Sequence, residues 1–247
     1  MIIKNIFKVH FLFYIVTFIV IITGFFKPFL LINMLIIVHE IGHLIAAVYF
    51  KWQIDKIIIF PFGGVTIFKD FINKPIKEEF IILIMGPLFQ TIFYLIIIFL
   101  FGENDLLKIL NYSLLLFNLL PIYPLDGSKF IYLFFQKILP FKLSHILIII
   151  VSLIFIFLLL FYFKFNLILL ILLFLLLLKN LKEIKNHQFI FNKFLLERYL
   201  YDFNFKKKKY LKNTNLNIMY RDYYHYFYYK NNYITEKKLL SKKFDFN

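Results

Sequence analysis

Residues 36–45 read Ile-Ile-Val-His-Glu-Ile-Gly-His-Leu-Ile, and this stretch decides how the rest of the chain is interpreted. Its ionisable side chains, His39, Glu40 and His43, stand inside an apolar run. Each ionisable side chain at mid-bilayer costs about 2.5–3.5 kcal/mol on insertion scales, so the cluster needs compensation. At positions i and i+4 of a helix, the two histidines lie on one face and can bind one Zn²⁺ ion. Glu40 points about 100° away, where it can act as general base without being a ligand. The alternative, a core histidine pair satisfied by hydrogen bonds, fits poorly among Ile, Leu and Val.

The surrounding chain has the composition of an integral membrane protein. Of its 247 residues, 62% are hydrophobic and 22% aromatic, and the mean hydropathy is +0.78. Soluble domains are only about 45–50% apolar. With no cysteine, a disulfide scaffold, an iron–sulfur site and a thiol nucleophile are excluded. We predict an all-α polytopic membrane protein with about six transmembrane helices, at roughly 11–27, 29–50, 79–101, 109–121, 143–162 and 165–178.

The net charge of +15 reports membrane topology rather than nucleic-acid binding, because the lysines stand beside apolar runs. Lysines precede the first span, fill the connections after the second and fourth, and crowd the tail, whereas residues 102–108 are net acidic. The positive-inside rule therefore predicts cytoplasmic N- and C-termini and an active site toward the cytoplasmic side.

Residues 57–68 are apolar, too short for a span and interrupted by Gly63 and Gly64. We interpret them as a β-like loop that dips into the membrane and pairs with extended substrate. An ordinary interfacial loop is the alternative. Gly86, which precedes a proline, is interpreted as a site of close helix packing.

From residue 183 the apolar runs stop, so we divide the chain into a transmembrane domain, 1–182, and a cytoplasmic tail, 183–247. Residues 223–235 are typical of a strand, a turn and a strand, which predicts a small α/β tail. His10, His145, His187 and His225 have no partner at metal-ligand spacing and are assigned interfacial or surface positions.

A third zinc ligand is sought in residues 118–127, Asn-Leu-Leu-Pro-Ile-Tyr-Pro-Leu-Asp-Gly. Pro121 and Pro124 prevent an ordinary helix there, and irregular backbone is tolerated at membrane depth where it lines a cavity or packs in protein. Asp126 is the candidate ligand; taken alone, it would be a turn aspartate before glycine. Asn118 can donate to substrate backbone or cap the broken helix. We expect Asn118 and the two prolines, with Gly63 and Gly64, to bind substrate.

The His39–His43 and Asn118–Gly127 motifs together resemble those of the site-2 protease family of intramembrane zinc metalloproteases. Pro61-Phe62-Gly63-Gly64, the stretch from Pro75 to Phe80 and the stretch from Phe194 to Tyr199 resemble its sporulation branch, of the stage IV sporulation factor B type. The resemblance implies His39, His43 and Asp126 as zinc ligands and Glu40 as the catalytic base.

In that branch the substrate is a membrane-associated pro-sigma factor, processed at the mother-cell side of the membrane around the forespore. The resemblance also implies inhibitory membrane protein partners, and it leaves a homo-oligomer open. Asp126-Gly127-Ser128 replaces the family's usual Asp-Gly-Gly. The tail is shorter than the nucleotide-sensing CBS module of the branch, so it is interpreted as a shortened CBS-like module.

Three other readings are open. A peripheral zincin of the prenyl-protein protease type would need a downstream glutamate ligand on a helix, and the Asp126 motif favours the present assignment. A zinc transporter or other non-enzymatic zinc-binding membrane protein would need further midplane carboxylates, which the sequence lacks outside the two motifs. A site-2-type protease could also act on another membrane substrate, such as an anti-sigma factor.

Overall fold

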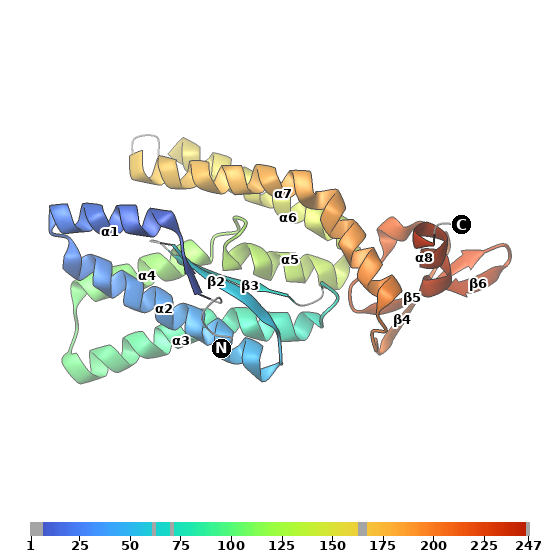
Figure 1. The fold of residues 1–247 in the computed structure, drawn as a ribbon, viewed down its shortest axis with the longest axis horizontal. Helices are drawn as coiled ribbons and strands as arrows, with labels where there is room; N and C mark the ends of the chain where they lie inside the picture. Colours follow the sequence, from blue (N-terminus) through green and yellow to red (C-terminus); the bar gives the residue numbers. More distant parts are fainter. Residues whose placement is uncertain (1–6, 61–62, 70–71, 163–166, 246–247) are drawn as a thin grey trace. The chain divides into compact units, whose positions relative to one another are not determined.

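Apolar helices account for most of the chain (Figure 1). The structure is a computed structural model that describes residues 7–60, 63–69, 72–162 and 167–245. Among these residues, three helices are long and apolar enough to cross a membrane: α2 (Phe26–Tyr49), α3 (Ile76–Phe101) and α6 (Phe141–Tyr162). The other predicted spans coincide largely with the shorter helices α1 (Phe11–Thr23) and α4 (Asp105–Asn118) and with the first half of α7 (Leu167–Leu200). The helical class is therefore confirmed, and the number of six spans stays a prediction.

The chain divides into two units. The first comprises Met1–Asp70 and Glu78–Leu119, and the second comprises Phe71–Lys77 and Leu120–Asn247. The domain boundary predicted after residue 182 falls inside α7, a continuous helix that carries the chain from an apolar half into a charged half.

In the first unit, α2 packs against α4 and the strand β3 (Gly63–Phe68). Leu35 and Ile36 of α2 meet Tyr94 of α3 and two leucines of α4 in a buried cluster. Leu107 and Leu114 are seven positions apart in α4, so they share one face of that helix. This packing holds the middle of α2, where the histidines stand.

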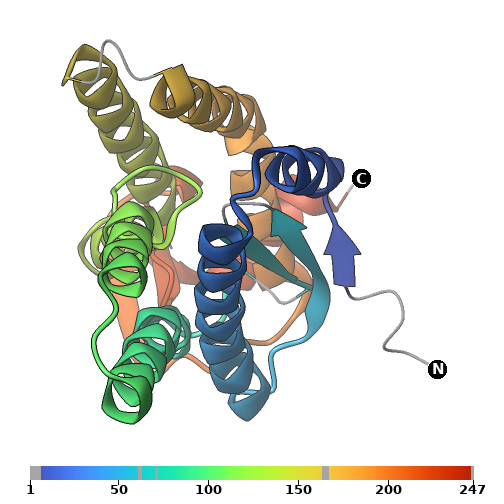
Figure 2. The ribbon, with the colours of Figure 1, turned by 90° about the vertical axis from the view of Figure 1, so that its left-hand side faces the viewer.

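The predicted β-like segment forms two antiparallel strands, β2 (Ile54–Phe60) and β3, as the β-branched run Ile57-Ile58-Ile59 favours. The short strand β1 (Phe7–Val9) pairs in parallel with β2, so the order is β1-β2-β3 and β3 is an edge of this sheet. Figure 2 shows the strands beside α2. The β character of residues 57–60 and 63–68 is confirmed, residues 61–62 lie outside the described residues, and the depth of the segment in a membrane stays a prediction.

In the second unit, α6 and α7 run side by side (Figure 1), and α5 (Asp126–Ile138) packs on α6. The tail continues with a three-stranded sheet, in which β4 pairs in parallel with β5 and β5 pairs antiparallel with β6. Its elements are β4 (Lys207–Leu211), the 3-10 turn η2 (Leu216–Ile218), β5 (Tyr223–Tyr229), β6 (Asn232–Thr235) and α8 (Glu236–Phe244). The predicted strand, turn and strand are present; the likeness to a CBS module stays a prediction.

The charged pair Glu197 and Arg198, near the end of α7, anchors the segment that leads into α3. Arg198 is 1% exposed and its Nε donates to Asn73 Oδ1 at 2.7 Å. Asn73 Nδ2 in turn donates to Glu197 Oε2 at 2.9 Å. A buried charge is tolerated only when it is paired and hydrogen-bonded, and Arg198 is both, because its Nη1 also lies 3.2 Å from Glu236 Oε2.

Candidate metal centre

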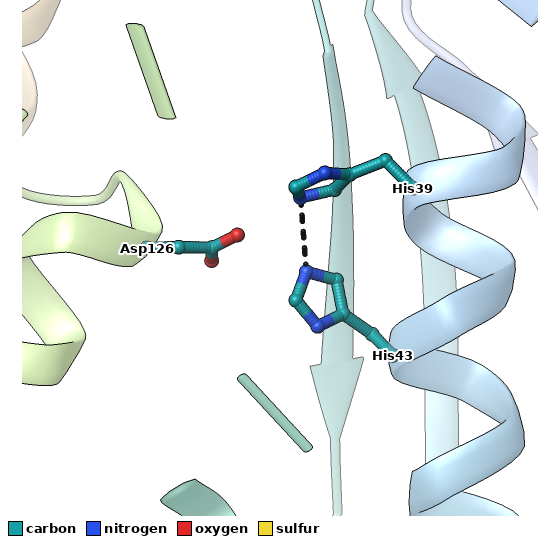
Figure 3. A group of neighbouring side chains, drawn as sticks. All are labelled: His39, His43 and Asp126. Carbon is teal, nitrogen blue, oxygen red and sulfur yellow. Dashed lines mark hydrogen bonds between the residues drawn. The ribbon is translucent and has the colours of Figure 1, made fainter. Parts of the chain in front are cut away.

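The two histidines of α2 project one turn apart from the same face of the helix (Figure 3), and their exposures are 2% for His39 and 7% for His43. Their Nε2 atoms are 3.1 Å apart. Two nitrogen ligands about 2.0–2.1 Å from a tetrahedral zinc ion lie about 3.3 Å apart. The pair therefore has the spacing of two ligands of a single ion.

The outer nitrogens of both rings have acceptor partners. His39 Nδ1 is 3.0 Å from Gln90 Oε1, and His43 Nδ1 is 2.8 Å from the carbonyl oxygen of Ile82. Gln90 is itself oriented, because its Nε2 donates to Asn111 Oδ1 at 2.9 Å. A carbonyl oxygen can only accept, so each Nδ1 carries the ring proton and each Nε2 keeps its lone pair. Both imidazoles are thus prepared to bind a cation through Nε2.

Glu40 lies against the edge strand β3. Thr66 Oγ1 donates to Glu40 Oε2 at 3.0 Å, which fixes one carboxylate oxygen. A Cβ atom at Gly64 would lie 2.9 Å from Glu40 Oε1 and closer still to the side-chain carbons. Only glycine at this position lets the strand approach the carboxylate so closely. Glu40 and Gly64, predicted as base and substrate-binding residue, are therefore brought together.

Two further glycines shape the histidine pair. A Cβ atom at Gly86 of α3 would lie 2.9 Å from His39 Nε2 and would overlap His43 Nε2. A Cβ atom at Gly42 would overlap the carbonyl oxygen of Met85. Gly42 thus permits the close packing of α2 on α3 that the sequence predicted for Gly86. Gly86 itself borders the Nε2 atoms of His39 and His43. The interpretation of Gly86 as a packing residue alone is incomplete for that reason.

Asp126, in the second unit, is the first residue of α5 and is 7% exposed. The helix N-terminus stabilises a carboxylate there, and Lys129 Nζ lies 2.9 Å from Asp126 Oδ1. Residues 119–125 are not helical, as Pro121 and Pro124 predict. Asp126 is therefore a buried, held carboxylate at the start of a helix rather than an exposed turn residue.

The remaining predicted substrate-binding residues occupy segment ends. Asn118 is the last residue of α4, Gly63 the first of β3, and Pro121 and Pro124 flank a turn before α5. Their roles toward substrate stay predictions.

Sequence reasoning missed Gln90, Asn111 and Thr66. Gln90 and Asn111 are uncharged polar residues within predicted spans, and both are buried, at 0% and 1% exposure. Polar side chains in membrane helices usually face other helices, so their position was a usable signal. Nothing around Thr66 distinguishes it in the sequence.

The assignment of His145 and His225 to interfacial or surface positions is wrong, because both are buried, His225 at 0% exposure. His145 is 4% exposed, and its Nδ1 is 2.7 Å from His187 Nδ1. The pairing of α6 with α7 brings together residues that are far apart in the sequence, which single-residue reasoning does not anticipate.

Comparison with known proteins identifies relatives of part of the chain. Residues 28–105 match the model of peptidase family M50. The stage IV sporulation protein FB of Bacillus subtilis is 39% identical over 131 residues, covering 50% of this chain and 45% of that protein. A zinc metalloprotease of Methanocaldococcus jannaschii is 31% identical over 111 residues, covering 41% of this chain and 32% of that protein. The matches thus span less than half the length of these relatives.

A solved structure has the same fold. The site-2 protease from Methanocaldococcus jannaschii superposes with a TM-score of 0.50 and 24% sequence identity. The match covers 83% of this chain and 96% of that one. Together with the apolar helices, these relatives identify an integral membrane protein.

Proposed function

We propose that the chain is a member of the site-2 protease family and a zinc metalloendopeptidase that cleaves its substrate within the membrane, as its similarity to peptidase family M50 and to its relatives supports. One observation carries the proposal: the Nε2 atoms of the two histidines of α2 are 3.1 Å apart, each Nδ1 faces an acceptor oxygen, and Glu40 follows the first histidine directly. This combination provides two metal ligands and an adjacent base.

The proposed zinc ligands are His39, His43 and Asp126. The proposal is supported by their chemistry, since all three are buried and each offers one ligand atom (Figure 3). Two imidazole nitrogens and one carboxylate oxygen make a donor set typical of catalytic zinc, which leaves the fourth position for water or substrate.

In the proposed mechanism, Glu40 removes a proton from the attacking water and returns it to the departing amine. A zinc ion held by the three ligands supplies a Lewis acid that makes water nucleophilic at neutral pH. Thr66 holds Glu40 Oε2, so the other oxygen of the carboxylate is left for the proton.

The sheet supports a role for β3 in substrate binding. A helical substrate hides its carbonyl groups in hydrogen bonds, so it must become extended before attack. The edge strand β3 is unpaired on one side among the described residues, and its Gly64 borders Glu40. An extended substrate added to this edge would be aligned by main-chain hydrogen bonds beside the proposed base.

The proposed substrate is a membrane-associated pro-sigma factor, released by cleavage during sporulation. The identity to stage IV sporulation protein FB supports this branch. We also propose that the active site and both termini face the cytoplasm, as the lysine distribution indicates, and that membrane protein partners inhibit the enzyme.

Substitution of Glu40 by glutamine tests the function. Glu40→Gln keeps the shape of the side chain and leaves the metal ligands intact, so we expect normal zinc content. Loss of the base should lower cleavage by about 10²–10⁴-fold. The measurement is product formation on co-expression with a candidate pro-sigma factor, with zinc content of the purified protein determined in parallel.

Two comparisons make this test specific. Glu103→Gln makes the same chemical change at an exposed carboxylate and should cleave like the unsubstituted protein. Asp126→Ala should lose both zinc and cleavage. Undiminished cleavage by Glu40→Gln would show that Glu40 is not the base. Wild-type protein that binds no stoichiometric zinc would refute the metalloprotease assignment.

A further inference from the structure

The backbone N–H and carbonyl oxygen of Tyr123 are both hydrogen-bonded to side chains of α6 and α7, and its hydroxyl faces a carboxylate of α7. Its N–H donates to Ser152 Oγ at 2.7 Å. Its carbonyl oxygen accepts from Asn180 Nδ2 at 3.0 Å, and its hydroxyl interacts with the nearby carboxylate of Glu183. Among the described residues of 119–125, Tyr123 makes the most hydrogen bonds to α6 and α7.

Burial makes these hydrogen bonds strong constraints. Ser152 and Asn180 are both 0% exposed. A buried polar group left without its partner costs about 1–3 kcal/mol, so movement of Tyr123 away from its partners is opposed at several atoms at once. Tyr123 therefore has one favoured position on the α6–α7 pair.

Glu183 is fixed from its other side by histidines. His145 Nε2 is 3.0 Å from Glu183 Oε1, and the side chain of Glu183 is 12% exposed. The rings of His145 and His187 stack with centroids 5.0 Å apart, and their Nδ1 atoms are 2.7 Å apart. His187 Nε2 is buried without a hydrogen-bond partner among the described atoms. A cluster that leaves a buried nitrogen unsatisfied is not arranged for stability alone.

Tyr123 is joined to Asp126 by a short, stiff turn. The N–H of Leu125 donates to the carbonyl oxygen of Ile122 at 2.8 Å, which closes the turn around Tyr123. Pro124 has a restricted φ angle, and Ser128 Oγ donates to the carbonyl oxygen of Leu125 at 2.6 Å. Displacement of Tyr123 therefore moves the start of α5 rather than being absorbed by a flexible loop.

We propose that Tyr123, Glu183 and His145 are positioning residues that set the place of the Asp126 carboxylate. The inference rests on the proposed function, because that carboxylate matters as the third zinc ligand. Metal sites tolerate ligand displacements of only about 0.5 Å, so they depend on partners that hold the ligands. For Asp126 that support is the side-chain cluster on α6 and α7, acting through Tyr123.

Zinc affinity of the full-length protein in detergent tests this inference. Tyr123→Phe removes one hydroxyl, and Glu183→Leu removes the carboxylate; each should weaken zinc binding by about 10-fold or more, the usual effect of losing a partner behind a metal ligand. Glu183→Gln should restore most of the affinity, because its amide oxygen has the shape and capacity to accept from the Tyr123 hydroxyl. A role in general stability alone would lower the melting temperature without this graded change in zinc affinity.

The controls separate this inference from the proposed function. Tyr233→Phe and Glu103→Leu make the same chemical changes at exposed positions and should leave zinc affinity unchanged. If Asp126→Ala loses zinc while Tyr123→Phe and Glu183→Leu stay within twofold of wild type, the positioning role is wrong and the proposed function stands. If Asp126→Ala binds zinc normally, the proposed ligand set fails and the positioning role fails with it. Should Glu183→Leu not fold, Tyr123→Phe decides alone.

Discussion

Each of the two proposed histidine ligands is oriented by a residue of α3. Gln90 in α3 accepts from His39 Nδ1 and is oriented by Asn111 in α4. The backbone carbonyl of Ile82 does the same for His43. At the residue scale, therefore, the proton position on each ring is decided by its neighbour rather than by the histidine itself.

Gln90→Leu should weaken zinc binding by about 10–100-fold, because the ring of His39 loses the acceptor that orients it. Zinc titration of the purified full-length protein measures the change. Gln188→Leu, at an exposed position of α7, is the matched control and should have no effect. Equal affinity of Gln90→Leu and wild type would mean that the α2 helix alone orients His39.

At the scale of elements, two backbones approach the site and each borders a different functional group. α3 passes the histidine nitrogens at Gly86, and β3 passes the Glu40 carboxylate at Gly64. A methyl group added at Gly86 should therefore affect zinc binding, whereas one added at Gly64 should affect cleavage.

Gly86→Ala should abolish zinc binding. The new methyl group would occupy space beside His43 Nε2 and His39 Nε2, where the ion must sit. Metal analysis of the purified protein measures the loss, and an unaltered melting temperature shows that the fold is kept. Stoichiometric zinc in this variant would place the ion on another side of the rings.

Gly64→Ala should keep zinc and slow cleavage. The methyl group would displace Glu40 from its contact with Thr66 but would not touch the histidines. Because general-base catalysis contributes about 10²–10⁴-fold, a displaced base should cost cleavage on the order of 100-fold. Cleavage and zinc content are measured on the same preparation. Loss of zinc instead would contradict the view that β3 borders the proposed base, Glu40, and not the histidines.

At the scale of the whole molecule, a buried histidine in the tail links folding to pH. His225 is 0% exposed; its Nδ1 is 2.9 Å from Glu236 Oε2, and its Nε2 accepts from the N–H of Tyr220 at 3.0 Å. Burial lowers the pKa of His225, against the opposing effect of Glu236. Protonation at Nε2 would also break the hydrogen bond from Tyr220. The folded state therefore favours the neutral ring.

Stability of the protein should fall as the pH drops below the ordinary histidine pKa of about 6.5. There the unfolded chain takes up a proton that the folded tail resists, at a cost of up to about 1.4 kcal/mol per pH unit. Thermal unfolding between pH 5.5 and 7.5 measures this slope. His225→Gln should flatten it, and His10→Gln, in the first unit, should not. An equal slope in His225→Gln would assign the pH dependence to other groups.

The sequence by itself determined the features that depend on short-range spacing. The period of the helix places His39 and His43 on one face, the apolar run at 57–68 interrupted by glycines predicts β-like chain, and two prolines end the helix before Asp126. Each of these follows from backbone geometry within a few residues, so no knowledge of packing is required.

Only the tertiary structure decided which distant side chains support those residues. Gln90 behind His39, Gly64 and Thr66 beside Glu40, and the His145–Glu183 pair beneath Tyr123 come from other elements. Such pairings depend on how helices and strands pack. A polar residue in an apolar run indicates that its side chain needs a hydrogen-bond partner. It does not indicate which one, because the free-energy cost of burying the polar group is offset by any suitable partner.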